Sequence, residues 1–139
     1  MSSVVATDNT RAVEEERITE VMRDGLLIRH MTDPSHEVEL TAVRQNGKSI
    51  MYILNPSIEV MTAAVQQDGL CIKYITVQPE TVKLAAVMQN PNCIIHVLSP
   101  SETVKLAVVR QDGLLIKYMT DLTEAVKSAA LLQNPNTII

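Results

Sequence analysis

Two cysteines and three histidines are the side chains of this sequence that could bind a metal or act as nucleophiles. Cys71 and Cys93 are separated by a 22-residue interval, and His30 and His96 by three times that interval. His36 has no Cys, His or paired carboxylate at the short spacing typical of zinc ligands. No Ser–His–Asp or Cys–His arrangement recurs, and no glycine-rich loop resembles a phosphate-binding loop. We therefore expect no metal, no cofactor and no catalytic residue, and predict that the protein is not an enzyme.

A second set of residues could recognise a partner rather than react with it. Rings with a polar tip recur with a 22-residue period, at His30, Tyr52, Tyr74, His96 and Tyr118. Tyrosine supplies rigid contact area together with a hydrogen-bonding tip. The column could form a recognition stripe, or its rings could be half-buried against the next repeat. The second interpretation is the favoured one.

Cations recur at twice that spacing, and in each case a leucine stands one helical turn before the cation. The pairs are Leu26/Arg29, Leu70/Lys73 and Leu114/Lys117. Three cations on one face could recognise a partner with a matching spacing. Duplication of an ancestral pair of units would give the same alternation without any function. We predict that these pairs, with Tyr52, Tyr74 and Tyr118, bind a partner.

These columns belong to an internal repeat that determines the fold. The runs DGLLIRH, DGLCIKY and DGLLIKY begin at Asp24, Asp68 and Asp112, and variants lie midway between them, which gives a 22-residue period. Because no residue is inserted or deleted over the array, every unit should have the same shape. The expected units are approximately 11–32, 33–54, 55–76, 77–98, 99–120 and 121–139, preceded by a flexible arm at 1–10.

Cap residues predict two helices in each unit. Asp or Asn at position 46 and its equivalents is followed by Gly or Pro, which is typical of a helix N-terminus. A second column, predicted to cap the first helix, contains Asp33, Asn55, Val77, Ser99 and Asp121. Ser99 and Glu102 have the spacing of a capping box. Pro79 comes one place late, so an irregular start is expected near Val77. The two helices should have about 12 and about 8 residues.

Helices this short are unstable alone and must stack on their neighbours. We expect an all-α fold, an αα-solenoid of six 22-residue helical-hairpin repeats wound as a right-handed superhelix, forming a single domain over 11–139. Cys71 and Cys93 share an inward column, where a helix spacing of about 8–10 Å exceeds the reach of a disulfide. They are expected to be free core thiols. A glutamine column at the end of the first helices should form a ladder between units rather than face a ligand.

The two ends of the array are predicted to differ. Glu16 stands where later units carry valine, which is typical of a polar first cap. The last unit leaves Leu131, Ile138 and Ile139 uncovered, so we expect a homodimer that pairs these residues across a two-fold axis. Folding of the tail over its own end is the alternative.

Composition narrows the function classes. The formal net charge of −4 disfavours a phosphate-binding surface. The start MSSVVATDNT has neither the basic nor the apolar region of a signal peptide, and no apolar run approaches the ~18 residues of a membrane span. With two cysteines a disulfide framework is excluded, so a cytoplasmic location without membrane contact is expected.

The run V-K-L-A-A-V-x-Q-N/D-G-x-x-I-K-Y, best matched at 82–96 and 104–118, resembles a family of short helical repeats. This AVxQ[ND]GxxI-type family of unknown function occurs in bacterial, phage and large-virus proteins, and is more loosely similar to HEAT-type repeats. The resemblance covers residues 11–139 and implies an αα-superhelix with a binding role. It supplies no catalytic residue. Pro91 and Pro135 depart from it at the glycine position.

We therefore predict a non-enzymatic protein–protein interaction module that acts as an adaptor or an inhibitor, such as a phage-encoded factor acting on a host protein. The alternative is a nucleic-acid-binding repeat protein, although nucleic acid is the less expected partner. That alternative needs a row of cations in one groove, made of Lys73, Lys83, Lys105, Arg110, Lys117 and Lys127.

Overall fold

The computed structural model describes residues 2–139, and this part of the chain is all-helical, with 72% helix and no strand. Within it, six α-helices alternate with five 3₁₀ helices. In chain order they are α1 (Ser2–Arg23), η1 (Gly25–His30), α2 (His36–Gln45), η2 (Gly47–Tyr52), α3 (Ile58–Gln67), η3 (Gly69–Tyr74), α4 (Glu80–Gln89), η4 (Pro91–His96), α5 (Glu102–Gln111), η5 (Gly113–Tyr118) and α6 (Glu124–Gln133).

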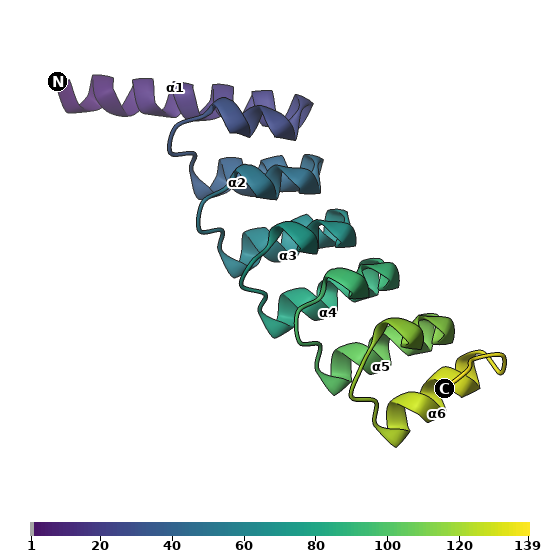
Figure 1. Cartoon of the computed structure of the whole chain (residues 1–139). Helices are drawn as coiled ribbons and strands as arrows, with labels where there is room; N and C mark the ends of the chain where they lie inside the picture. Colours follow the sequence, from purple (N-terminus) through teal and green to yellow (C-terminus); the bar gives the residue numbers. More distant parts are fainter. Residues whose placement is uncertain (1) are drawn as a thin grey trace.

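The helices form two rows. Each α-helix packs against the α-helices before and after it, and the 3₁₀ helices pack on one another in a second row (Figure 1). Each 3₁₀ helix also contacts the α-helix that precedes it and the one that follows it. The all-α, repeated pattern predicted from the sequence is confirmed.

The second helix of each pair is a six-residue 3₁₀ helix, shorter than expected, and α2–α6 are ten-residue helices. Bonds from residue i+3 to residue i hold its ends, such as Leu27 N–H to Asp24 O at 3.1 Å. A 3₁₀ helix rises about 2.0 Å per residue, so the second helix spans ~12 Å. The α-helix beside it spans ~15 Å. The tighter helix therefore covers most of its partner with few residues.

One predicted cap column is wrong. Asp33, Asn55, Ser99 and Asp121 do not cap helices but have φ values of 48°, 50°, 46° and 53°. Asp and Asn tolerate this left-handed conformation better than most residues. The helices α2, α3, α5 and α6 are capped further along the chain, by the hydroxyls of Ser35, Ser57, Ser101 and Thr123. The proposed capping box at Ser99 is therefore absent.

The irregular start expected near Val77 is confirmed. Val77 is not among the residues with a left-handed backbone, which suits a β-branched side chain. Pro79 stands at the N-cap position of α4, which consequently has no side-chain cap.

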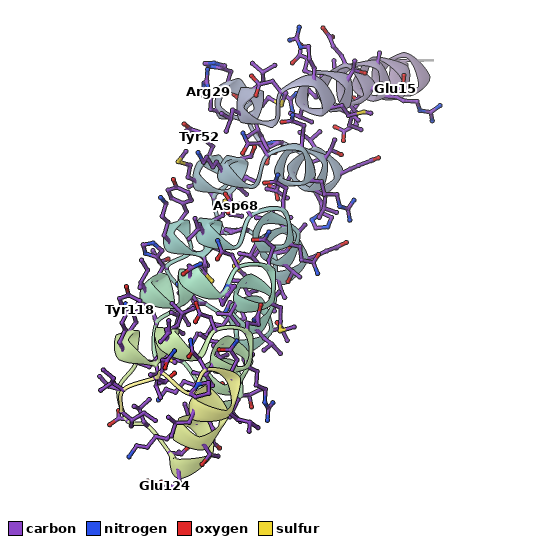
Figure 2. The ribbon with its side chains drawn as sticks, turned by 90° about the vertical axis from the view of Figure 1, so that its right-hand side faces the viewer. Glu15, Arg29, Tyr52, Asp68, Tyr118 and Glu124 are labelled. Atoms are coloured by element: carbon purple, nitrogen blue, oxygen red, sulfur yellow. The ribbon has the colours of Figure 1, made fainter. Side chains whose placement is uncertain are left out.

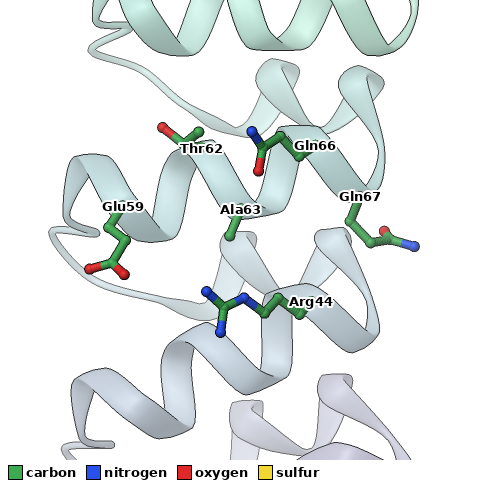
Figure 3. A pocket seen from close by; sticks show the side chains of 6 residues that line it. All are labelled: Arg44, Glu59, Thr62, Ala63, Gln66 and Gln67. Atoms are coloured by element: carbon green, nitrogen blue, oxygen red, sulfur yellow. The ribbon is translucent and has the colours of Figure 1, made fainter.

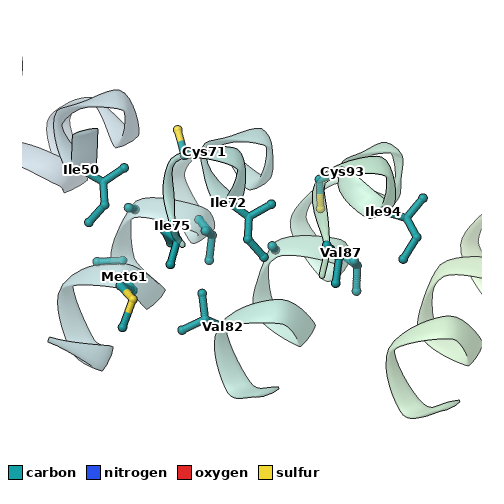
Figure 4. Close-up of a cluster of buried hydrophobic side chains, with 14 of the residues drawn as sticks. Ile50, Met61, Cys71, Ile72, Ile75, Val82, Val87, Cys93 and Ile94 are labelled. Atoms are coloured by element: carbon teal, nitrogen blue, oxygen red, sulfur yellow. The ribbon is translucent and has the colours of Figure 1, made fainter. Parts of the chain in front are cut away.

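The core is a run of small apolar columns between neighbouring units (Figure 4). Ile72 and Val87 are fully buried, as are Cys71 and Cys93, whose thiols are free as predicted. Valine and isoleucine fill these narrow layers without the volume that Phe or Trp would require.

The first unit differs from the others. Residues 2–10, predicted to be a flexible arm, lie in α1, which extends past the end of α2 (Figure 1). Nothing in the aperiodic sequence there predicts a helix, because its apolar pattern is not that of the repeats. The polar first cap is confirmed, since Glu16 is exposed and lines a hollow with Thr19, Glu20 and Arg23.

Candidate functional site

The predicted partner-binding residues all lie on the row of 3₁₀ helices. We name this surface the η face and define it as η1–η5 with the loops that follow them, at 31–35, 53–57, 75–79, 97–101 and 119–123. Figure 2 shows Arg29, Tyr52 and Tyr118 along one edge of the stack, in the order of the units that carry them. The 22-residue spacing therefore places these side chains in one line.

Each cation of the alternating pairs contacts the ring that follows it. The Lys73 Nζ lies 5.1 Å from the centroid of the Tyr74 ring, and Lys117 lies at the same distance from Tyr118. The Arg29 Nε donates to the His30 Nε2 at 3.1 Å. A cation over an exposed ring gains about 0.5–1 kcal/mol. These contacts orient the cations while leaving them exposed to solvent.

Burial of the other predicted residues is uneven. Leu26, Leu70 and Tyr74 are half-buried, and Tyr74 packs against the core. Leu114 and Tyr118 are exposed, like Tyr52. The half-buried interpretation of the ring column therefore holds for Tyr74, whereas Tyr52 and Tyr118 present their rings to solvent.

The η face is also free of carboxylates over its helices. The segments η1–η5 contain no Asp or Glu, and their cations are Arg29, Lys48, Lys73 and Lys117. The glutamates of the chain lie on the α-helices. The two rows therefore differ in the sign of their fixed charge.

The cations required by the nucleic-acid alternative are divided between the two rows. Lys73 and Lys117 lie on the η face, and the remaining four lie on α4, α5 and α6. On the α-helices, Lys83 donates to Ser99 O at 3.3 Å and Lys105 donates to Thr120 O at 2.7 Å. These two ammonium groups hold the loop of the next unit, so the six cations do not form one groove.

The glutamine column forms the predicted ladder. The Oε1 atoms of four glutamines accept from glycine N–H groups of the preceding unit at 2.6–2.7 Å. The pairs are Gln45–Gly25, Gln67–Gly47, Gln89–Gly69 and Gln133–Gly113. Pro91 has no N–H, and there Gln111 instead donates to Val87 O at 2.9 Å. The amides are therefore structural and do not face a ligand.

An open hollow of about 440 Å³ lies on the outer side of α2 and α3 (Figure 3). Its charged residues are Arg44 and Glu59. The Glu59 carboxylate is 2.9 Å from the His36 Nε2, and Gln67 belongs to the ladder. Glu59 and Gln67 therefore have partners within the fold, whereas Arg44, Thr62 and Gln66 form no side-chain hydrogen bond with the described residues.

The thiols are poorly placed for chemistry. Burial raises the pKa of both Cys71 and Cys93 to about 12, so neither is a thiolate at neutral pH. Over residues 2–139, no three or more His, Cys, Asp or Glu side chains gather as metal ligands. Among the described helices none has the length and apolarity needed to cross a bilayer.

The residues predicted to form a dimer are exposed at the end of the stack. Ile138 is 92% exposed, and Leu131 and Ile139 are also exposed. Ala130, in the turn of α6 that precedes Leu131, is buried, and its carbonyl lies close to Gly113 of the preceding unit. Dimer formation stays a prediction.

Comparison of the chain with protein-family models, with curated proteins and with solved structures found no match.

Proposed function

We propose that this chain is an αα-solenoid of six 22-residue repeats with a right-handed superhelix, and that it is a non-enzymatic protein-interaction module, an adaptor or an inhibitor. The observation that carries this proposal is the η face. It combines exposed cations held over rings, exposed Tyr52 and Tyr118, and 3₁₀ helices without a carboxylate. Tyrosine and arginine are enriched at protein interfaces, and Tyr52, Tyr118 and Arg29 fit this pattern on the η face.

The charge of the η face defines the partner. An acidic segment of another protein would bring carboxylates to Arg29, Lys73 and Lys117. The helices η1–η5 carry no like charge, and the loops of the η face carry two, at Asp33 and Asp121. Because these cations lie two units apart, a helix spacing of about 8–10 Å separates them by about 16–20 Å. An extended polypeptide covers that distance in about five or six residues.

The same spacing makes nucleic acid the less suitable partner. Phosphates follow one another every ~3.4 Å of helix axis along a strand, far more closely than the three cations. At most about four phosphates would be neutralised, by Arg29, Lys48, Lys73 and Lys117, which gives a slope near −3.6. A strongly salt-dependent shift with single- or double-stranded DNA would reverse this preference.

The test is charge reversal on the η face. The variant Lys73→Glu/Lys117→Glu is compared with Arg44→Glu/Arg110→Glu, which makes the same change in net charge at exposed positions of the α-helices. Partners are captured from a host lysate, identified by mass spectrometry and titrated as purified proteins. We expect the η-face variant to lose the partner and the α-helix variant to retain it. Retention by the η-face variant would show that the wrong face was chosen.

We also propose that the exposed apolar residues Leu131, Ile138 and Ile139 mediate self-association. The exposure of Ile138 supports this proposal, since an isolated isoleucine at 92% exposure gains about 1.5–3 kcal/mol from full burial.

A further inference from the structure

A cleft of about 440 Å³ lies between the loops at 53–57 and 75–79 of the η face. Its lining is mainly apolar and contains no charged residue. Leu54, Tyr74, Val77 and Pro79 are among the residues that line it. A volume of this size lies within the ~300–1,000 Å³ range of ligand sites.

The cleft lies where the chain departs from its own repeat. Leu54 is 89% exposed in a column that alternates between threonine at 32, 76 and 120 and leucine at 54 and 98, and Leu54 is the more exposed of the two leucines. Val77 is 81% exposed at a position where the other units have Asp, Asn or Ser. Two large, solvent-exposed apolar side chains are therefore neighbours here, and one of them, Val77, stands where every other unit has a polar residue.

A polar link between units is also missing here. At three other junctions a glutamate accepts from the cap hydroxyl of the next unit, as Glu102 does from Thr123 at 2.5 Å. At the junction beside the cleft the equivalent positions hold Ile58 and Pro79, which cannot form this bond. Pro79 also leaves α4 uncapped, at a cost of about 1 kcal/mol.

The wall of the cleft is nevertheless fixed, because Gln78 ties its loop to the unit on the other side. Its Nε2 donates to Ile75 O at 3.2 Å and to His96 O at 3.0 Å, and its Oε1 accepts from Leu98 N–H at 2.8 Å. The loop at 75–79 is thus tied to the loop of the following unit. A cleft with a fixed wall loses less entropy on binding than a flexible one.

Departures from local sequence preferences, such as a missing helix cap, occur most often at functional sites, and exposed apolar clusters mark interaction surfaces. We propose that this cleft is the anchor site for one apolar side chain, Leu or Phe in size, of an extended partner segment whose flanking residues are acidic. This inference rests on the proposed function. The positive charge of Lys73 should favour acidic residues on either side of the anchored side chain. Tyr74 lines the cleft, and the Lys73 ammonium lies 5.1 Å from the centroid of its ring.

The probes are two libraries of short synthetic peptides with a central Leu or Phe, one flanked by Asp and Glu and the other by Lys and Arg. Binding is measured by fluorescence anisotropy. Leu54→Thr restores the residue of the alternating units and removes one wall of the cleft. Leu98→Thr makes the same change at the equivalent exposed position outside the cleft. Val77→Asn restores the residue found at Asn55 and serves as a second cleft variant. Thermal melting verifies that each variant is folded.

We expect acidic-flanked peptides to bind the wild type, with about a tenfold or greater loss of affinity in Leu54→Thr and Val77→Asn and little change in Leu98→Thr. Equal losses in Leu54→Thr and Leu98→Thr, selection of the basic-flanked library, or no peptide binding would overturn the cleft proposal. Conversion of a dimer into a monomer by Leu54→Thr, without peptide binding, would identify a second copy as the occupant and also overturn the cleft proposal.

If Lys73→Glu/Lys117→Glu abolishes binding and Leu54→Thr does not, the cleft proposal is wrong and the assignment of binding to the η face stands. If neither change affects a bound peptide, the proposed function itself is wrong.

Discussion

Replacement of Gly69 by alanine should destabilise the stack. The Gly69 N–H donates to the Gln89 Oε1 at 2.6 Å, so the two units lie close together at this point. A Cβ on residue 69 would lie 2.5 Å from Ala86 O and 3.0 Å from the Gln89 Oε1. Gly69 has no left-handed φ, so the obstacle to a side chain is space and not backbone conformation. The carbonyl belongs to the last turn of α4, where it accepts from the Asn90 N–H at 2.9 Å, so it cannot move without disturbing the end of the helix.

Three contributions set the size of the effect. Overpacking at a rigid contact costs about 1–3 kcal/mol. Lengthening the ladder bond loses about 1 kcal/mol. Replacement of glycine in the unfolded chain offsets about 0.4–1 kcal/mol. The free energy of unfolding should therefore fall by about 2 kcal/mol, which lowers Tm by roughly 5–10 °C for a chain of this size.

The assay is urea unfolding followed by circular dichroism, and the matched control is Pro91→Ala. Pro91 occupies the glycine position of its unit, where a Cβ and a ring are already accommodated and no ladder bond exists. We expect the control to change the free energy of unfolding by less than about 1 kcal/mol. A Gly69→Ala variant as stable as the wild type, or an equal loss in both variants, would refute the packing argument.

Three other changes give distinct outcomes. Gln89→Ala leaves the Gly69 N–H without its partner and should lower the free energy of unfolding in urea by about 1–3 kcal/mol. Gln111→Ala removes a bond to Val87 O but no bond to a glycine N–H, and it should cost less. Equal losses in the two variants would contradict the ladder. Burial raises the pKa of Cys71 and Cys93 to about 12, above the value of ~8.5 in the unfolded chain. The contribution of the two neutral thiols to the free energy of unfolding is therefore complete below about pH 8.5 and is lost as pH rises toward about 12. The unfolding free energy of the wild type should thus fall more steeply over that interval than that of Cys71→Ala/Cys93→Ala, and parallel curves would rule this out. Light scattering should show a wild-type dimer that Ile138→Asp converts to a monomer, and a monomeric wild type at high micromolar concentration would end the dimer proposal.

The sequence predicts the repeat and much of its packing because the 22-residue columns are uninterrupted. The Asp and Asn residues before Gly or Pro do cap the second helices, as the bond from Leu70 N–H to the Asp68 Oδ1 at 3.1 Å illustrates. The sequence indicates less clearly whether the second helix of each unit is an α-helix or a 3₁₀ helix, since this depends on the length of the α-helix that it must cover. The left-handed residues at Asp33 and its equivalents resemble caps in the sequence because Asp and Asn are common at both positions, and the fourth residue, Ser99, is a frequent cap.

The candidate site is predictable in part. The repeat period places the cations and rings in one line, as the sequence analysis expects. Their contacts within a unit, such as Lys73 over Tyr74, depend on side-chain direction and are not fixed by spacing. The cleft is not predicted, because finding it requires knowledge of which loops are neighbours. Its signal in the sequence is the departure of Val77 and Pro79 from their columns, next to the leucine at position 54.

Hydrogen–deuterium exchange with and without a saturating acidic-flanked peptide tests the central claim most directly, because it reports on both rows of helices at once. A partner that binds the η face should slow exchange in η2, η3 and the loops at 53–57 and 75–79. Exchange in α2 and α3, whose outer sides face away from the peptide, should be unchanged. Protection confined to the α-helices would contradict the assignment of binding to the η face.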